Sequence, residues 1–212
     1  MIVLGLTGSI GMGKSTTARL FAEEGALVHD ADEAVHRLYA PGGAAVGPVG
    51  AAFRGAVSES AVDRQALARI LAETPNGLRR LEAIVHPLVA RSRDSFLDKA
   101  VQAGAKVAVL DVPLLFETGG DGRLDAVVVA SAPAEVQLQR VLQRPGMSKA
   151  RLAQLLDRQT PDAEKRARAD FVVETGGGLD DARAQVRQIL ATVMQPGWRS
   201  RRPLAGNREA SH

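Results

Sequence analysis

Residues 8–15 read GSIGMGKS, and this stretch decides the fold class. It matches the pattern G-x-x-x-x-G-K-[ST] at every fixed position. The apolar run Ile2–Thr7 before it has the composition of a buried strand, and Thr16–Glu24 after it has the spacing of an amphipathic helix. Glycines let successive backbone N–H groups curve around phosphate oxygens, and the N-terminal end of the helix adds positive charge. The stretch therefore predicts a strand, a phosphate-binding P-loop and a helix that together bind a nucleoside triphosphate.

Individual residue types in this loop have distinct chemical tasks. The Lys14 ammonium can reach the β- and γ-phosphates, and the Ser15 hydroxyl can ligate Mg²⁺. We therefore expect ATP as a substrate, Mg²⁺ as the cofactor and Lys14 as a catalytic residue. The candidate nucleotide-binding residues of this segment are Gly8, Gly11, Met12, Gly13, Lys14, Ser15 and Thr16.

Further apolar runs predict the rest of the fold. Strands are expected at Ala26–Asp30, Lys106–Asp111, Ala126–Ala130 and Phe171–Glu174, with helical spacings between them. This alternation predicts an α/β fold of the P-loop kinase type, with three layers and a parallel sheet of about five strands.

The chain divides into four predicted parts. Residues 1–32 and 105–194 would form the core, with a helical lid at about 140–168. Residues 33–104 contain no strong strand and read as a helical insertion that binds the acceptor, in which a helical pattern ends at His86–Pro87. Residues 195–212 read as a flexible basic tail.

Composition excludes several classes. The 212 residues are 45% apolar and 24% charged, which is ordinary for a globular protein, and the absence of cysteine excludes a disulfide scaffold and thiol catalysis. The sequence contains no apolar run of about 20 residues, as a membrane span needs, and the start lacks a basic leader. We expect a cytoplasmic protein without a membrane partner.

Two aspartates follow the second predicted strand, at Asp30 and Asp32. Ligands of open parallel sheets bind outside the carboxyl ends of the strands. A hydroxyl acceptor loses its proton as it attacks the γ-phosphate, so a carboxylate there can act as a general base. Strand alternation would put both aspartates on one face, with Asp32 nearer the strand's end. Asp30 and Asp32 could otherwise be helix N-caps.

The third predicted strand ends in Asp111, within the sequence DVPLLFE. An aspartate after an apolar strand can hold Mg²⁺ directly or through water. Pro113 ends the strand, and Glu117 lies in the following loop.

Positive charge is concentrated between Arg140 and Arg168, although the whole chain carries only +3. Such a segment points to a phosphate-bearing ligand. Arg140 and Arg144 lie four residues apart, on one face of a helix expected over residues 137–144. From a lid, their guanidinium groups would neutralise charge on the transferring phosphoryl group.

An ordered set of motifs resembles the dephospho-coenzyme A kinase family, over about residues 2–194. They are LTGSIGMGKST, DAD ending at Asp32, LYAPGG, DRQALARI, IVHPLV around His86, DVPLLFE, QLQRVLQR, Gln159 and Ala169–Asp170. The resemblance implies transfer of the ATP γ-phosphate to the ribose 3′-hydroxyl of dephospho-CoA.

The resemblance also implies site roles. Asp32 would be the base, Gly11 to Thr16 and Arg140 would bind the ATP phosphates, and His86 would help to shape the acceptor site. We also expect Arg144 to bind the nucleotide, and Asp32, Pro113 and Glu117 to bind the acceptor. Thr175 stands where the family usually has an asparagine near the nucleotide base.

Two alternatives stay open at this point. Another small-metabolite kinase, of shikimate or gluconate type, could also carry aspartates after the second strand, although its insertion is generally shorter. A nucleic-acid-binding protein could use the basic segment, but aromatics make up only 3% of the chain. We expect ATP and dephospho-CoA as partners, no nucleic acid, and a monomer or weak homo-oligomer.

Overall fold

The computed structural model describes residues 1–199, and the chain forms two compact units. Among the described residues, unit 1 comprises 1–28 and 100–199, and unit 2 comprises 29–99. Most of the predicted basic tail 195–212 lies outside the described residues. No helix within residues 1–199 is long and apolar enough to cross a membrane.

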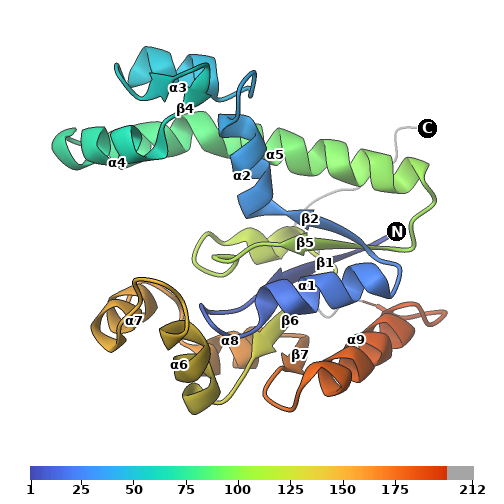
Figure 1. The fold of residues 1–212 in the computed structure, drawn as a ribbon. Coiled ribbons are helices and arrows are strands. Elements are labelled where there is room, and N and C mark those ends of the chain that lie inside the picture. Colours follow the sequence, from blue (N-terminus) through green and yellow to red (C-terminus); the bar gives the residue numbers. More distant parts are fainter. Residues whose placement is uncertain (200–212) are drawn as a thin grey trace. The chain divides into compact units, whose positions relative to one another are not determined.

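A five-stranded sheet has the order β2-β5-β1-β6-β7 (Figure 1). β1 pairs in parallel with β5 on one side and β6 on the other, and β6 pairs in parallel with β7. The strands are β1 (Ile2–Thr7), β2 (Leu27–Asp30), β5 (Val107–Asp111), β6 (Ala126–Ser131) and β7 (Phe171–Glu174). The predicted strands and the predicted fold class are confirmed.

Helices of unit 1 flank this sheet. Leu4, Leu6 and Val128 point from one face toward a cluster that includes Phe21 of α1 and Val186 of α9. On the opposite face, Leu115 and Leu124 pack closely on Gly5, where a Cβ would lie 2.3 Å from a terminal methyl of Leu124. The helices are α1 (Lys14–Glu23), the 3₁₀ helix η1 (Gly120–Arg123), α6 (Ala134–Leu142), α7 (Lys149–Leu156), α8 (Asp162–Arg168) and α9 (Leu179–Val193).

After the end of β2, unit 2 is helical apart from a two-stranded hairpin that the sequence did not reveal. Its core gathers Val49, Phe53, Leu67 and Leu88. The elements are α2 (Ala31–Tyr39), α3 (Val46–Ala52), β3 (Val57–Ser58), β4 (Ala61–Val62), α4 (Arg64–Glu73) and α5 (Gly77–Gln102), whose last residues belong to unit 1.

Three local expectations are wrong. The helical pattern does not end at His86–Pro87, because α5 continues through Pro87 with Val85 and Leu88 buried on either side of it. Arg144 is not helical, since α6 ends at Leu142. Asp30 and Asp32 do not share one face of a strand, because α2 begins between them at Ala31.

Candidate active site

The P-loop joins β1 to α1 in unit 1, with a backbone that only glycine suits at two positions. Gly11 has φ +79° and Gly13 has φ +85°, in the left-handed region. Space is also restricted, since a Cβ on Gly13 would lie 2.8 Å from Oγ1 of Thr175, and one on Gly11 would lie 2.6 Å from Val141. Gly13 is the N-cap of α1 and provides no side-chain cap, so the helix presents its first N–H groups as an anion-binding end.

Helix α6 holds the other side of the loop. Nε2 of Gln137, which is buried, donates to the Ile10 carbonyl at 2.8 Å. The Ala132 N–H, just before the helix, contacts the sulfur of Met12 at 3.2 Å. The fixed loop needs little reordering to receive phosphates.

Lys14 and Asp111 form an ion pair. The Asp111 carboxylate is only 2% exposed, and the Lys14 side chain is 15% exposed at the start of α1. The structure thus joins the residue predicted to bind phosphate to the residue predicted to bind Mg²⁺. Ser15 and Thr16 are exposed in the first turn of α1.

Arg140 reaches back from α6 to the end of β7. Its Nη1 donates to the hydroxyl of Thr175 at 2.8 Å and to the Gly11 carbonyl at 3.5 Å, and its Nη2 donates to the Thr175 carbonyl at 2.6 Å. Arg144 is exposed beyond the end of α6. The two arginines therefore have different surroundings.

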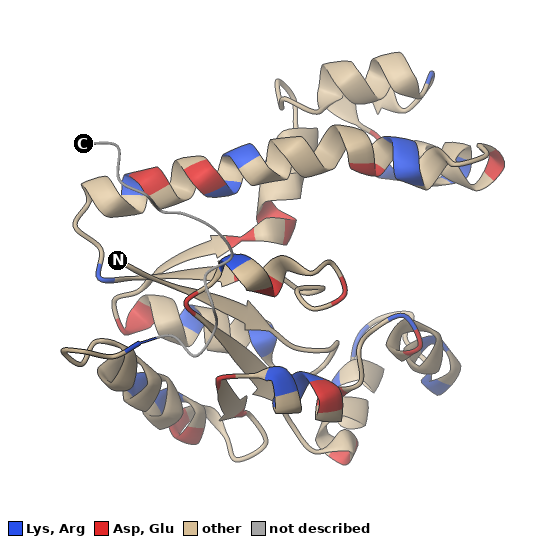
Figure 2. Ribbon diagram, turned by 180° about the vertical axis from the view of Figure 1, so that it is seen from behind, with Lys and Arg blue, Asp and Glu red and all other residues tan. Residues whose placement is uncertain are grey.

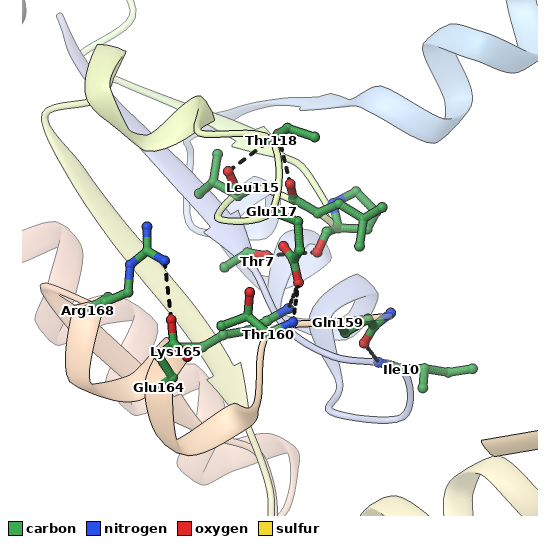
Figure 3. A network of polar contacts seen from close by, with 12 residues as sticks. Thr7, Ile10, Leu115, Glu117, Thr118, Gln159, Thr160, Glu164, Lys165 and Arg168 are labelled. Carbon is green, nitrogen blue, oxygen red and sulfur yellow. Dashed lines mark hydrogen bonds and ion pairs between the residues drawn. The ribbon is translucent and has the colours of Figure 1, made fainter. Parts of the chain in front are cut away.

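Glu117 anchors the connection between α7 and α8 (Figure 3). Its Oε1 accepts a hydrogen bond from the Thr160 N–H at 2.8 Å and lies 3.0 Å from Nζ of Lys165, which is completely buried. The neighbouring Gln159 accepts from the Ile10 N–H at 3.4 Å. These contacts link the segment after β5, the predicted lid and the P-loop within unit 1.

The environment of Glu117 also sets its charge. Burial alone would raise the pKa of this carboxyl, but the N–H groups of Thr160 and Glu117 and the Lys165 ammonium outweigh burial and lower the pKa below its ordinary value. The ionised form is therefore the one that the fold stabilises. Sequence reasoning missed Lys165, since nothing in the sequence distinguishes it from Arg166 and Arg168.

Pro113 lies in the same segment. Its carbonyl accepts a hydrogen bond from the Thr7 hydroxyl at 3.0 Å, which fixes the chain after β5 to the end of β1.

Figure 2 marks the positions of Lys and Arg along the ribbon. Part of the basic segment 140–168 has structural partners. Arg166 pairs with Glu174, and Arg168 lies 3.4 Å from Asp121 and stacks over the Phe116 ring at 4.2 Å. Arg166 and Arg168 are thus exposed but paired, whereas the exposed basic residues of the segment that form no ion pair within residues 1–199 are Arg144, Lys149, Arg151 and Arg158. The charge that the segment offers to a phosphate ligand is thus smaller than its composition suggests.

The remaining candidates belong to unit 2. Asp30 is the N-cap of α2 and accepts from the Glu33 N–H at 3.0 Å, whereas Asp32 is exposed in the first turn. His86 is exposed on α5. The carboxylate of Asp30 therefore has a structural task, and that of Asp32 is available to a ligand.

A family model described as dephospho-CoA kinase matches residues 2–181. The chain belongs to the dephospho-CoA kinase family. A dephospho-CoA kinase from Mesorhizobium japonicum is 60% identical over 90% of this chain and 95% of its own length. One from Brucella melitensis is 53% identical over 90% of this chain and 94% of its own.

Solved structures share the fold of this chain. A Thermus thermophilus protein with 36% identity covers 92% of this chain and 98% of its own, with a TM-score of 0.77. The fold is also that of a Campylobacter jejuni dephospho-CoA kinase, with a TM-score of 0.67, 24% identity, and 90% and 96% of the two chains covered. The predicted family and the prediction of a kinase that uses ATP are confirmed, and a shikimate or gluconate kinase is not favoured.

Proposed function

We propose that this enzyme transfers the γ-phosphate of ATP to the ribose 3′-hydroxyl of dephospho-CoA and so makes CoA, in the last step of CoA biosynthesis. The observation that carries the assignment is the dephospho-CoA kinase match over residues 2–181, which includes the whole P-loop. The loop geometry supports the phosphate-binding half of the reaction.

The P-loop residues would bind the triphosphate. Backbone N–H groups from Gly8 to Thr16 would surround the phosphates, and the Lys14 ammonium would offset charge on the β- and γ-phosphates. Arg140 would contribute a second cation to the transferring phosphoryl group, with Arg144 beside the nucleotide.

Mg²⁺ is the cofactor that we propose for ATP binding. The Ser15 hydroxyl and the Asp111 carboxylate are the hard oxygen donors that this ion prefers. Mg²⁺ usually keeps several waters and binds through one or two protein oxygens together with substrate phosphates. When bound, Mg²⁺ supplies neutralisation of phosphate charge.

Asp32 is the residue that we propose as the general base for the 3′-hydroxyl. It is an exposed carboxylate directly after the edge strand β2, and its neighbour Asp30 already serves as a helix cap. A base of this kind accepts the hydroxyl proton as the oxygen attacks phosphorus.

The pair Asp32→Asn and Asp30→Asn tests this role. We expect Asp32→Asn to lower kcat by about 10²–10⁴, the usual contribution of a positioned base. Asp30→Asn should leave kcat and folding nearly unchanged, because asparagine caps helices as well as aspartate does. Near-wild-type turnover in Asp32→Asn would exclude Asp32 as the base, and an inactive Asp30→Asn beside it would point to Asp30 instead.

The acceptor-binding region stays a proposal. We place it in residues 33–104, with His86 as a contributor, and we assign Pro113 and Glu117 to the acceptor side. The lid at about 140–168, the cytoplasmic location and a monomer or weak homo-oligomer without nucleic acid also remain predictions.

A further inference from the structure

Thr175, the residue directly after β7, accepts the two shortest hydrogen bonds from the guanidinium of Arg140. Thr175 accepts from Nη1 through its hydroxyl at 2.8 Å and from Nη2 through its backbone carbonyl at 2.6 Å. Two contacts on two nitrogens fix both the position and the plane of a guanidinium group. Thr175 is also 6% exposed, so water does not readily replace it as a partner.

The same hydroxyl ties the arginine to the P-loop. Oγ1 of Thr175 donates to the Met12 carbonyl at 2.9 Å. A hydroxyl has one hydrogen and can still accept, and arginine can only donate, so the two bonds are compatible and their directions are fixed. Met12, Thr175 and Arg140 thus form a continuous chain of hydrogen bonds.

Thr175 is itself rigidly placed. Its N–H donates to the Ser131 carbonyl at 2.8 Å, which continues the pairing of β6 with β7. Its side chain packs so closely on Gly13 that a Cβ there would come within 3.0 Å of Cγ2. The arginine therefore rests on a residue that the sheet and the P-loop both hold.

We propose that Thr175 is a positioning residue for phosphoryl transfer, whose hydroxyl orients Arg140 beside the P-loop. Of the five N–H donors of arginine, three make the contacts above, which leaves Nε–H and one Nη2–H without a partner among residues 1–199. These two donors suit the oxygens of a nucleoside triphosphate. The inference rests on the role proposed above for Arg140.

Isosteric variants of Thr175 test the proposal. Thr175→Val removes the hydroxyl and keeps the shape, and Thr175→Ser keeps the hydroxyl. We expect Thr175→Val to lower kcat about tenfold with a smaller change in KM for ATP, because one charge-assisted hydrogen bond is lost. Thr175→Ser should keep most of the wild-type kcat. Thr192→Val is the matched control, since that hydroxyl bonds only within α9, to Gln188.

A double-mutant cycle with Arg140→Ala separates positioning from a structural effect. If Thr175 acts through Arg140, Thr175→Val lowers kcat no further in the Arg140→Ala background. Fluorescence of Trp198, the one tryptophan, which packs against the core of unit 1, checks folding, and Thr175→Ala replaces Thr175→Val if the latter does not fold.

Different outcomes identify different errors. Suppose that Arg140→Ala lowers kcat as expected. The positioning role of Thr175 is then overturned if the two losses of kcat multiply in the double variant, or if Thr175→Val has wild-type or higher kcat. Wild-type kcat in Arg140→Ala would overturn the role of Arg140 and the positioning role together. Neither result would contradict the proposal that the enzyme phosphorylates dephospho-CoA.

Discussion

Replacing Glu117 by glutamine should destabilise unit 1, because it leaves the ammonium of Lys165 buried without its carboxylate. Nζ of Lys165 is 0% exposed and lies 3.0 Å from Oε1 of Glu117. With an effective dielectric constant of about 20, two unit charges at that separation attract by about 5 kcal/mol. Measured losses on breaking buried pairs are about 3–5 kcal/mol. We expect about 3 kcal/mol for Glu117→Gln, since its side chain is 17% exposed and an amide oxygen can still accept from Thr160.

Lys165→Met should be milder, at about 1 kcal/mol, because methionine fills the buried volume and removes the charge that needs a partner. The remaining Glu117 carboxylate keeps the Thr160 N–H. The double variant should then resemble Lys165→Met rather than sum the two losses.

Urea unfolding followed by Trp198 fluorescence measures these differences in the unit that contains the pair. Lys149→Met, on the exposed face of α7, is the matched control and should change the unfolding free energy by less than about 0.5 kcal/mol. The reasoning is refuted if Glu117→Gln is as stable as the wild type, or if the double variant is less stable than Glu117→Gln.

Three other predictions concern phosphate binding, the metal and pH. Lys14→Met should fold and keep its helical content but lose most phosphoryl transfer, which a coupled ADP assay measures; near-normal turnover would contradict the P-loop assignment. Ser15→Ala should need more Mg²⁺ for half-maximal rate, and an unchanged Mg²⁺ titration would remove Ser15 from the metal site. Burial, and then the charge of Arg37, lower the pKa of His29 below 6.5, so the neutral ring is favoured in the fold. The stability that His29 contributes is present above pH 6.5 and is lost as the pH falls through its folded pKa. Nε2 of His29 lies 3.3 Å from the hydroxyl of Ser92 in α5, so hydrogen exchange in α5 should show this loss in the wild type. An equal loss in His29→Gln would contradict it.

The strands and the P-loop could be predicted because burial on both faces demands continuous apolar runs and phosphate binding demands glycines at fixed spacing. The predicted bounds match at Ile2–Thr7 and Phe171–Glu174, and each of the other three strands differs from its predicted bounds by one residue at one end. These features depend on residues that are close together in the chain.

Features that depend on distant partners were not predictable. Pro87 locally disfavours a helix, yet burial of Val85 and Leu88 keeps α5 continuous through it. The contact between Arg140 and Thr175 joins residues 35 apart, and that between Glu117 and Lys165 joins residues 48 apart. Composition indicated basic charge over residues 140–168, but it could not show which of these cations are paired with carboxylates in the fold.

Analysis of the product formed from ATP and dephospho-CoA tests the central claim most directly. Shikimate and gluconate serve as parallel acceptors, and mass spectrometry with phosphorus NMR locates the new phosphate. We expect ADP and CoA in equal amounts, with the added phosphate on the ribose 3′-hydroxyl and no product from the other two acceptors. Phosphorylation of shikimate or gluconate with none of dephospho-CoA, or phosphate at another position of dephospho-CoA, would contradict the account.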